Sequence, residues 1–495
     1  MPSLERSRFS SASPRGDALR PGHVALNLRV TFDVPMFRSV VLIPLIVGAA
    51  QFMHQFDGAV IATALPSMAA SLGEDPIRLN LAITSYLLAL AVFVPVSGWM
   101  ADKFGARRVF MSAILVFTAS SVLCGLSHSL PELVLYRTLQ GIGGAMMTPV
   151  GRVIVVKSVP KLQLVQAMNY ITVPAVLGPL LGPSVGGFIV TYFSWPWIFF
   201  INLPIGLLGI LLVRAYIPDI REEGVLPLDL RGSALIGIAV AGLVFGFEAL
   251  GRQVLPSWVV LASIGSGLLF GALYLIHARR TADPIVDLNL MRVRTFAASI
   301  SGGALFYLGT TSSVFLLALL LQLGFGFTAF QAGLMTLASA TGSLLQRLAF
   351  RSLLRPLGFR RLLIWNALIT GAYLTGCGFF RVSTPYVVIV LVLLIGGFSR
   401  SVQFTAVQSL GYAELPSALV SRTTAFSAMA QQLAQCIGVG MVALVVHLSL
   451  IWHGGAAIMA EDVALGYYVI GAAALVSTVI FYLLPAHAGV ELSDR

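Results

Sequence analysis

Fourteen apolar segments dominate this sequence, and each is long enough to cross a lipid bilayer as a helix. They span residues 40–65, 79–100, 109–127, 132–156, 164–191, 195–215, 231–250, 257–278, 296–321, 327–348, 361–380, 385–412, 423–448 and 463–484. Their apolar runs are continuous rather than alternating, which excludes a β-barrel. A soluble fold could not bury a chain that is 57% hydrophobic and only 10% charged. The sequence therefore predicts an all-α polytopic membrane protein with 14 transmembrane helices.

The basic residues predict the orientation of these helices. A net charge of +11 could indicate nucleic-acid binding, but the lysines and arginines lie in short loops between apolar segments, so we expect no nucleic-acid partner. With the N-terminus inside, 26 of the 31 basic residues lie on the inner side, and only Arg78, Arg252 and Arg381 lie in outer loops. Cytoplasmic loops of membrane proteins carry such an excess of lysine and arginine. We therefore expect a multi-pass protein of the plasma (bacterial inner) membrane, with both termini cytoplasmic.

The cysteines indicate neither a disulfide nor a metal site, and the chain ends are predicted to be cytoplasmic tails. Cys124, Cys377 and Cys436 all fall within apolar runs and show no paired spacing, so neither a disulfide framework nor a metal site is predicted. Residues 1–38 are rich in arginine and serine and lack the apolar core of a signal peptide, so they are predicted to be a disordered cytoplasmic tail. Residues 485–495 are predicted to form a short cytoplasmic tail.

A charged loop separates the second and third apolar segments. Its distinctive residues are Gly98, Asp102, Lys103, Gly105, Arg107 and Arg108. The simplest interpretation is a loop that sets topology, since its cations favour the cytoplasm. The alternative is a gate, in which Asp102 and the nearby arginines hold the cytoplasmic helix ends together.

A few charged side chains stand inside apolar segments, where an unpaired charge costs about 2.5–3.5 kcal/mol on insertion scales. Asp57 in the first segment is a candidate proton site or a partner for a buried cation, and His54 lies on the same helical face. Arg137 in the fourth segment needs an acceptor unless it extends to the outer interface. Asp57 and Arg137 fall at similar depth, so they could form a switchable ion pair if the first and fourth segments pack together. Arg400 in the twelfth segment is expected to face an aqueous cavity, with a structural bond to a carbonyl as the alternative.

The fifth segment carries a glycine–proline pattern, made up of Gly178, Pro179, Gly182, Pro183, Gly186 and Gly187. Glycines at every fourth residue form a bare stripe that another helix backbone can approach closely. The prolines loosen the same turns and permit a bend. Ordinary small-residue packing is the simpler interpretation of this segment.

Taken together, these patterns resemble the major facilitator superfamily. The loop at 98–108 resembles the superfamily's signature between the second and third spans. Arg137 with Gln140 and Gly141 resembles its fourth-span motif, and residues 177–187 resemble its antiporter motif. Residues 197–206 and Asp57 with Ala64, Leu65 and Pro66 resemble the fourteen-span drug:proton antiporters of the EmrB/QacA type, in particular the MdtD-like members. Two departures are Gly58, where a threonine is usual, and Arg355, where the second copy of the charged loop would have an aspartate.

The resemblance implies a domain organisation. It comprises an N-terminal six-helix bundle (39–215), a linker with two extra transmembrane helices (216–295) and a C-terminal six-helix bundle (296–484), related by pseudo-symmetry. Between the bundles we expect a cavity lined by Gln140, Asn202, Arg400, Gln403 and, at its edge, Glu248. For Glu248 an interfacial position is the favoured interpretation, and a peripheral contact with the substrate is the alternative.

The same resemblance implies proton-coupled efflux of small, often amphipathic molecules by alternating access. Because the superfamily packs its first and fourth spans together, Asp57 and Arg137 would form the ion pair. With His54, this pair would couple proton entry to substrate exit. The ligands would be protons and a small-molecule substrate, and no cofactor is expected because the proton motive force supplies the energy. We expect a monomer, and an accessory periplasmic adaptor is left open. A proton-coupled importer of the same fold is the main alternative. A membrane-embedded enzyme or channel is disfavoured, because the sequence has no nucleophile–base pairing, metal-ligand cluster or filter-like repeat.

Overall fold

The computed structural model describes residues 38–74, 76–222, 224–252, 255–327, 329–453 and 459–492. The predicted N-terminal tail therefore lies outside the described residues except for Arg38, and so does the side chain of Pro183. The first half of the described chain contains η1 (Arg38–Leu42), α2 (Ile43–Leu72), α3 (Pro76–Phe93), η2 (Val94–Val96), α4 (Ser97–Phe104), α5 (Ala106–Gly125), α6 (Leu130–Ser158), η3 (Lys161–Gln163), α7 (Leu164–Tyr192), α8 (Trp197–Phe200) and α9 (Asn202–Tyr216).

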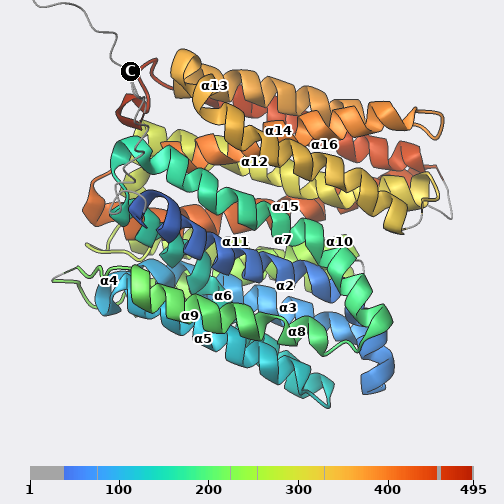
Figure 1. The fold of residues 1–495 in the computed structure, drawn as a ribbon, viewed down its shortest axis with the longest axis horizontal. Helices are drawn as coiled ribbons and strands as arrows, with labels where there is room; N and C mark the ends of the chain where they lie inside the picture. Colours follow the sequence, from blue (N-terminus) through green and yellow to red (C-terminus); the bar gives the residue numbers. More distant parts are fainter. Residues whose placement is uncertain are drawn as a thin grey trace, which may run out of the picture.

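The second half is also built from helices, with no strand among its described residues (Figure 1). It contains α10 (Leu230–Arg252), α11 (Ser257–Ala278), η4 (Leu288–Arg292), α12 (Arg294–Leu319), η5 (Leu320–Gly324), α13 (Ala329–Cys377), α14 (Tyr386–Leu410), η6 (Ser417–Leu419), α15 (Val420–Trp452), α16 (Ala460–Tyr482) and η7 (Val490–Leu492). The predicted all-α class is confirmed for the part of the chain that the structure describes.

The number of spans differs from the predicted fourteen. Among the described residues, 11 helices are long and apolar enough to cross a membrane. The number is 12 if Lys161–Pro179 and Ser184–Tyr192, bent by 44°, form one span. The two segments expected at 327–348 and 361–380 both fall in α13, which is not among these helices. Arginines near its middle and buried polar residues such as Asn366 interrupt its apolar sequence.

Helix α13 turns sharply at Gly358. This residue has φ 68° and ψ 168°, a conformation that glycine adopts readily because it has no Cβ. A straight helix of 49 residues would be about 74 Å long, far more than a hydrocarbon core of about 30 Å. The turn at Gly358 divides α13 into two arms.

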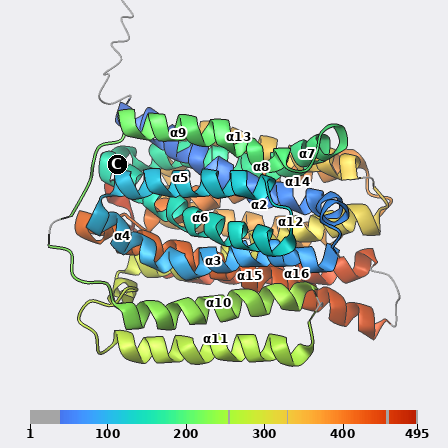
Figure 2. The ribbon, with the colours of Figure 1, turned by 90° about the horizontal axis from the view of Figure 1, so that it is seen from below.

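Most helix contacts fall within two groups. Helix α2 packs on α7, α6 on α3 and α5, and α5 on α9; in the second group α13 packs on α14 and α16, and α12 on α15 and α16. Helix α10 touches both groups, through α3 and α15. Helix α11 packs against α10 and lies on the outside of the molecule, with α10 between it and the two groups (Figure 2).

The two groups meet most closely at one end of the molecule, which we name the α4 end because it carries Ser97–Ala106. There α15 contacts α4 and η2, and α7 contacts α13 and α14. Asn169 of α7 accepts a bond of 3.1 Å from Gln346 of α13 and another of 3.1 Å from Thr405 of α14. Lys161 pairs with Glu491 at 2.9 Å, so the described part of the C-terminal tail also joins this end.

Candidate functional site

Asp57 and Arg137 form an ion pair buried among the helices of the first group. Asp57 stands on α2 and Arg137 on α6, and Nη1 of Arg137 lies 2.6 Å from Oδ2 of Asp57. The exposed fraction is 1% for Asp57 and 0% for Arg137. Removing one partner of such a pair would leave an uncompensated charge away from water, which is strongly destabilising.

Two amide side chains complete the coordination of Asp57. Gln140 donates to Oδ1 of Asp57 at 2.9 Å and accepts from Nη1 of Arg137 at 2.6 Å. Asn202, the first residue of α9, donates to the same Oδ1 at 3.1 Å and to Oγ of Ser121 at 2.9 Å. Gln140 and Asn202 were predicted to line the cavity, and that placement is wrong. Both are fully buried, and their amides are bonded to the ion pair.

Tyr86 of α3 lies between the ion pair and His54. Its ring covers the guanidinium of Arg137, with 4.4 Å from Cζ to the ring centroid. Its hydroxyl lies 2.6 Å from Nδ1 of His54. Gly144 of α6 leaves room for this contact, since a Cβ there would lie 3.0 Å from Nδ1 of His54. His54, which the sequence placed on the same helical face as Asp57, therefore contacts Tyr86.

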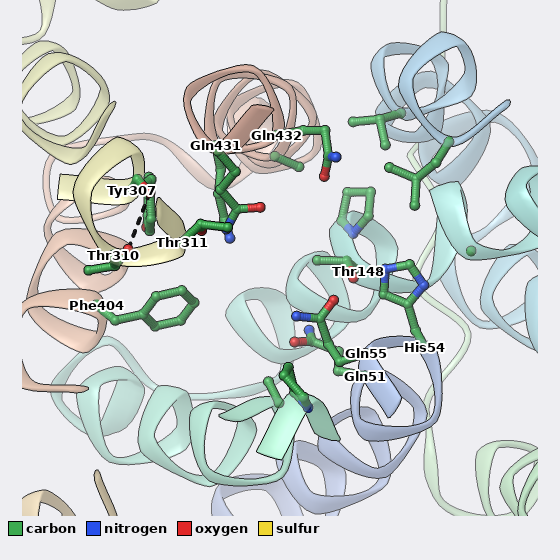
Figure 3. A pocket seen from close by; sticks show the side chains of 18 of the residues that line it. Gln51, His54, Gln55, Thr148, Tyr307, Thr310, Thr311, Phe404, Gln431 and Gln432 are labelled. Carbon is green, nitrogen blue, oxygen red and sulfur yellow. Dashed lines mark hydrogen bonds between the residues drawn. The ribbon is translucent and has the colours of Figure 1, made fainter. Parts of the chain in front are cut away.

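A cavity of about 390 Å³ lies between the two helix groups. Figure 3 shows Gln51, His54, Gln55 and Thr148 facing Tyr307, Thr310 and Phe404 across it, with Gln431 and Gln432 also at its wall. These residues come from α2, α6, α12, α14 and α15, so both groups contribute to the wall. His54 thus connects the cavity to the ion pair through Tyr86.

Of the residues predicted for the cavity, Arg400 does line it. Gln403 does not, because it is fully buried and its Oε1 accepts a bond of 2.9 Å from Asn366 of α13. Glu248 of α10 is half-buried and is absent from the described cavity wall.

Arg152 of α6 is a cavity residue that the sequence did not single out. It was grouped with the basic residues on the inner side, although it follows Arg137 by four helical turns in the same apolar segment. Its Nη2 donates to Oε1 of Gln431 on α15 at 3.2 Å. This contact joins the two helix groups next to the cavity.

At the α4 end, Asp102 contacts both groups. It accepts a bond of 2.5 Å from Oγ of Ser421 on α15, and Nζ of Lys157 on α6 lies 3.3 Å from the same Oδ1. Gly98 packs directly against α15, since a Cβ at this position would lie 2.5 Å from the carbonyl oxygen of Ser421. The gate hypothesis grouped Asp102 with the arginines of its own loop. Its described partners are Lys157 and Ser421 instead.

The arginines of the charged loop have a different acidic partner. Arg107 and Arg108 lie 3.7 Å and 3.6 Å from Oδ2 of Asp219, which follows α9. Gly105 has φ 92°, and a Cβ there would lie 2.9 Å from Oδ1 of Asp219. Lys103 is exposed. The sequence missed Asp219 because it stands more than 100 residues away, outside any recognised pattern.

The glycine stripe of α7 faces α2. A Cβ on Gly178 would lie 2.9 Å from the backbone nitrogen of Phe56, and one on Gly182 would lie 2.6 Å from Cβ of Ala59. Gly186 is equally close to α2, whereas Gly187 has nothing within 4 Å. Pro179 lines the cavity. The stripe thus brings α7 against the helix that carries Asp57 and His54.

Comparison with known proteins bears on this arrangement. Residues 47–439 match the family model of the Major Facilitator Superfamily. One relative is MdtD of Salmonella heidelberg, which is named as a multidrug resistance protein. It is 38% identical over 396 residues, which are 80% of this chain and 84% of that protein. The relative of the same name in Klebsiella pneumoniae is 38% identical over 81% of this chain and 85% of its own length.

Solved structures of transporters share the fold. The human organic anion transporter MFSD10 has a TM-score of 0.61 at 18% identity, covering 90% of this chain and 99% of its own. The proton:xylose symporter XylE has a TM-score of 0.63 at 16% identity, covering 91% and 97%. The chain is therefore a multi-pass membrane transporter, not an enzyme, and it belongs to the Major Facilitator Superfamily.

Proposed function

We propose that this transporter exports small molecules in exchange for protons, by alternating access of the cavity between the two helix groups. The observation that supports this most is the buried pair of Asp57 and Arg137. A charged pair at membrane depth is costly to keep, so its presence points to a working role. The relatives named as multidrug resistance proteins favour export over import.

In this proposal Asp57 takes up the proton. While Arg137 lies 2.6 Å away, the carboxylate is stabilised as an anion; once the two separate in an apolar surrounding, the neutral acid is favoured. Proton uptake and helix movement would therefore be coupled. His54 and Tyr86, which bridge the cavity and the pair, would transmit substrate binding to this switch.

We propose that the α4 end is cytoplasmic, because the basic residues concentrate at the loops that meet there. The two arms of α13 and the bent α7 would each cross the membrane, which would restore the fourteen spans. Residues 39–215 and 296–484 would form the two moving bundles, with α10 and α11 inserted between them in the sequence. The contacts of Asp102, Asn169 and Lys161 at the α4 end fit a state that is closed toward the cytoplasm.

The driving force is sufficient for export. One elementary charge moved across 100 mV corresponds to about 2.3 kcal/mol, which is roughly a fiftyfold concentration ratio. We propose that the transporter works as a monomer, with the proton motive force and no resident cofactor.

The test uses inside-out membrane vesicles that contain the transporter. Respiration acidifies their interior, and an acridine dye reports the pH difference by quenching. Addition of ethidium, naphthalene-2-carboxylate or phthalate should restore fluorescence for at least one compound, because an exporter would release a proton for each molecule that enters. Vesicles with Asp57→Asn should show no such response.

An importer would give a different result. It would bring about no proton release on external addition, and it would instead accumulate the compound in right-side-out vesicles when the outside is acidified. That second result would overturn the proposal of export.

A further inference from the structure

The cavity wall is positively charged. Arg152 comes from α6 in the first group and Arg400 from α14 in the second, and both line the cavity. The described cavity wall includes no aspartate or glutamate. Asp57 does not compensate these charges, because it is 1% exposed and its oxygens are taken by Arg137, Gln140 and Asn202.

Arg152 has an unused donor at the cavity. The residue is 4% exposed, and Nη2 donates to Gln431. Its buried Nη1 has no hydrogen-bond partner among the described residues, and neither has the buried Nε2 of Gln51, which lines the same cavity. A buried donor without an acceptor is costly, especially on a charged group. Both atoms would be satisfied by an acceptor placed in the cavity.

Arg400 also has no acceptor from the protein. Among the described residues, its guanidinium makes neither a hydrogen bond nor an ion pair. Guanidinium groups bind carboxylates in a matched, bidentate geometry. The remaining wall is largely apolar and includes Phe306, Phe315 and Phe404. The cavity thus combines two cations with an aromatic surface.

We propose that the transported substrate is an organic anion that carries at least one carboxylate. The carboxylate would accept hydrogen bonds from Arg152 and Arg400, and the carbon skeleton would pack against the phenylalanines. This inference rests on the proposed function and names its substrate class. A cation of similar size is disfavoured, because two like charges in a low-dielectric cavity repel it.

Because residues from both helix groups would bind the substrate, substrate binding would also be coupled to the relative position of the two groups. A carboxylate that engages Nη1 of Arg152 sits next to the bond between Arg152 and Gln431, which joins the groups. Export of an anion is in addition favoured by a membrane potential that is negative inside.

The test measures binding to the purified transporter in lipid nanodiscs without any gradient, so it does not depend on transport. Three compounds of matched shape are titrated by calorimetry: naphthalene-2-carboxylate, naphthalene-2-carboxamide and 2-naphthylmethylamine, with phthalate as a dianion. We expect at least one of the two anions to bind about tenfold or more tightly than the neutral amide, and the amine to bind weakest.

Variants locate the effect. Arg152→Gln and Arg400→Gln should each weaken anion binding by about tenfold and leave amide binding unchanged. Arg400→Lys should retain part of the anion binding. Arg280→Gln, an exposed arginine outside the cavity, is the matched control and should bind like the wild type. Arg400→Glu should reverse the preference toward the amine, which also guards against loss of binding through misfolding.

Two results would overturn the inference. The first is an amine that binds the wild type more tightly than either anion. The second is anion binding that is unchanged in the folded double variant Arg152→Gln/Arg400→Gln. Anion binding without proton exchange in the vesicle assay would leave the substrate class standing and contradict only the proposed export.

Discussion

Ser421 of α15 donates a hydrogen bond of 2.5 Å to Asp102 of α4, and so joins the two helix groups at the α4 end. Hydrogen bonds to charged groups stabilise by about 1.5–3 kcal/mol. If the bond forms only when this end is closed, its loss shifts the equilibrium toward the opposite state. Mutation of this contact therefore tests gating directly.

The first prediction concerns this contact. Ser421→Ala should open the α4 end roughly ten- to a hundredfold more often, while Asp102 keeps its ion pair with Lys157. The measurement is the alkylation rate of a single cysteine placed at Gln435 in the cavity wall, with reagent applied from the α4 end and the three native cysteines removed. Lys103→Gln, at an exposed residue, should react like the parent, and an unchanged rate in Ser421→Ala would speak against the latch.

The second prediction concerns the glycine stripe. Gly182→Ala should lower the stability of the transporter by about 1–3 kcal/mol, because the new methyl group overpacks the contact with Ala59. Gly187→Ala, where nothing lies within 4 Å, should be neutral or slightly stabilising. Thermal unfolding in detergent compares the two. Equal melting temperatures would contradict the close approach of α7 and α2.

The third prediction separates the two roles of Tyr86. Tyr86→Phe keeps the ring over Arg137 and loses the bond to His54, so the protein should remain stable. Tyr86→Leu loses the cation–π contact as well, which is worth about 2 kcal/mol when desolvated. Thermal unfolding should rank the wild type and Tyr86→Phe together and Tyr86→Leu below them. Equal stability of the leucine variant would argue against a contribution from the ring.

The fourth prediction concerns topology. In a chain without native cysteines, Ser383→Cys in the exposed loop before α14 should react with an impermeant reagent added to intact cells. Arg361→Cys, near the turn of α13, should react only after permeabilisation. Labelling of Arg361→Cys from outside would contradict fourteen spans with the α4 end in the cytoplasm.

The ion pair was accessible to sequence reasoning because charges are rare in the apolar segments. Asp57 and Arg137 fell at similar depth, and few other partners were available to either. Their neighbours were not assigned correctly. Gln140 and Asn202 were placed in the cavity, because helical spacing does not tell which of two polar environments a buried amide joins.

Other parts of the site gave no sequence signal. Ser421 and Asp219 are ordinary residues far from the charged loop, and only the packing of α15 and the chain after α9 brings them to it. Arg152 was absorbed into the count of inner basic residues. The number of spans could not be settled from hydropathy, because α13 combines a turn at Gly358 with buried polar residues such as Gln346 and Asn366.

The most direct test of the proposed coupling is Asp57→Asn. The asparagine keeps the size of the side chain and an oxygen for Arg137, but it cannot exchange a proton. The measurement compares two modes in proteoliposomes with a compound that the wild type exports: uphill transport driven by a pH difference, and counterflow exchange without one.

The expected result is loss of uphill transport with counterflow retained, because only the proton-dependent step requires the carboxylate. The melting temperature of the variant is measured in parallel, since removing one charge of a buried pair costs about 3–5 kcal/mol. If the folded Asp57→Asn transporter still moves its substrate against a gradient when driven by protons, then Asp57 is not the coupling residue.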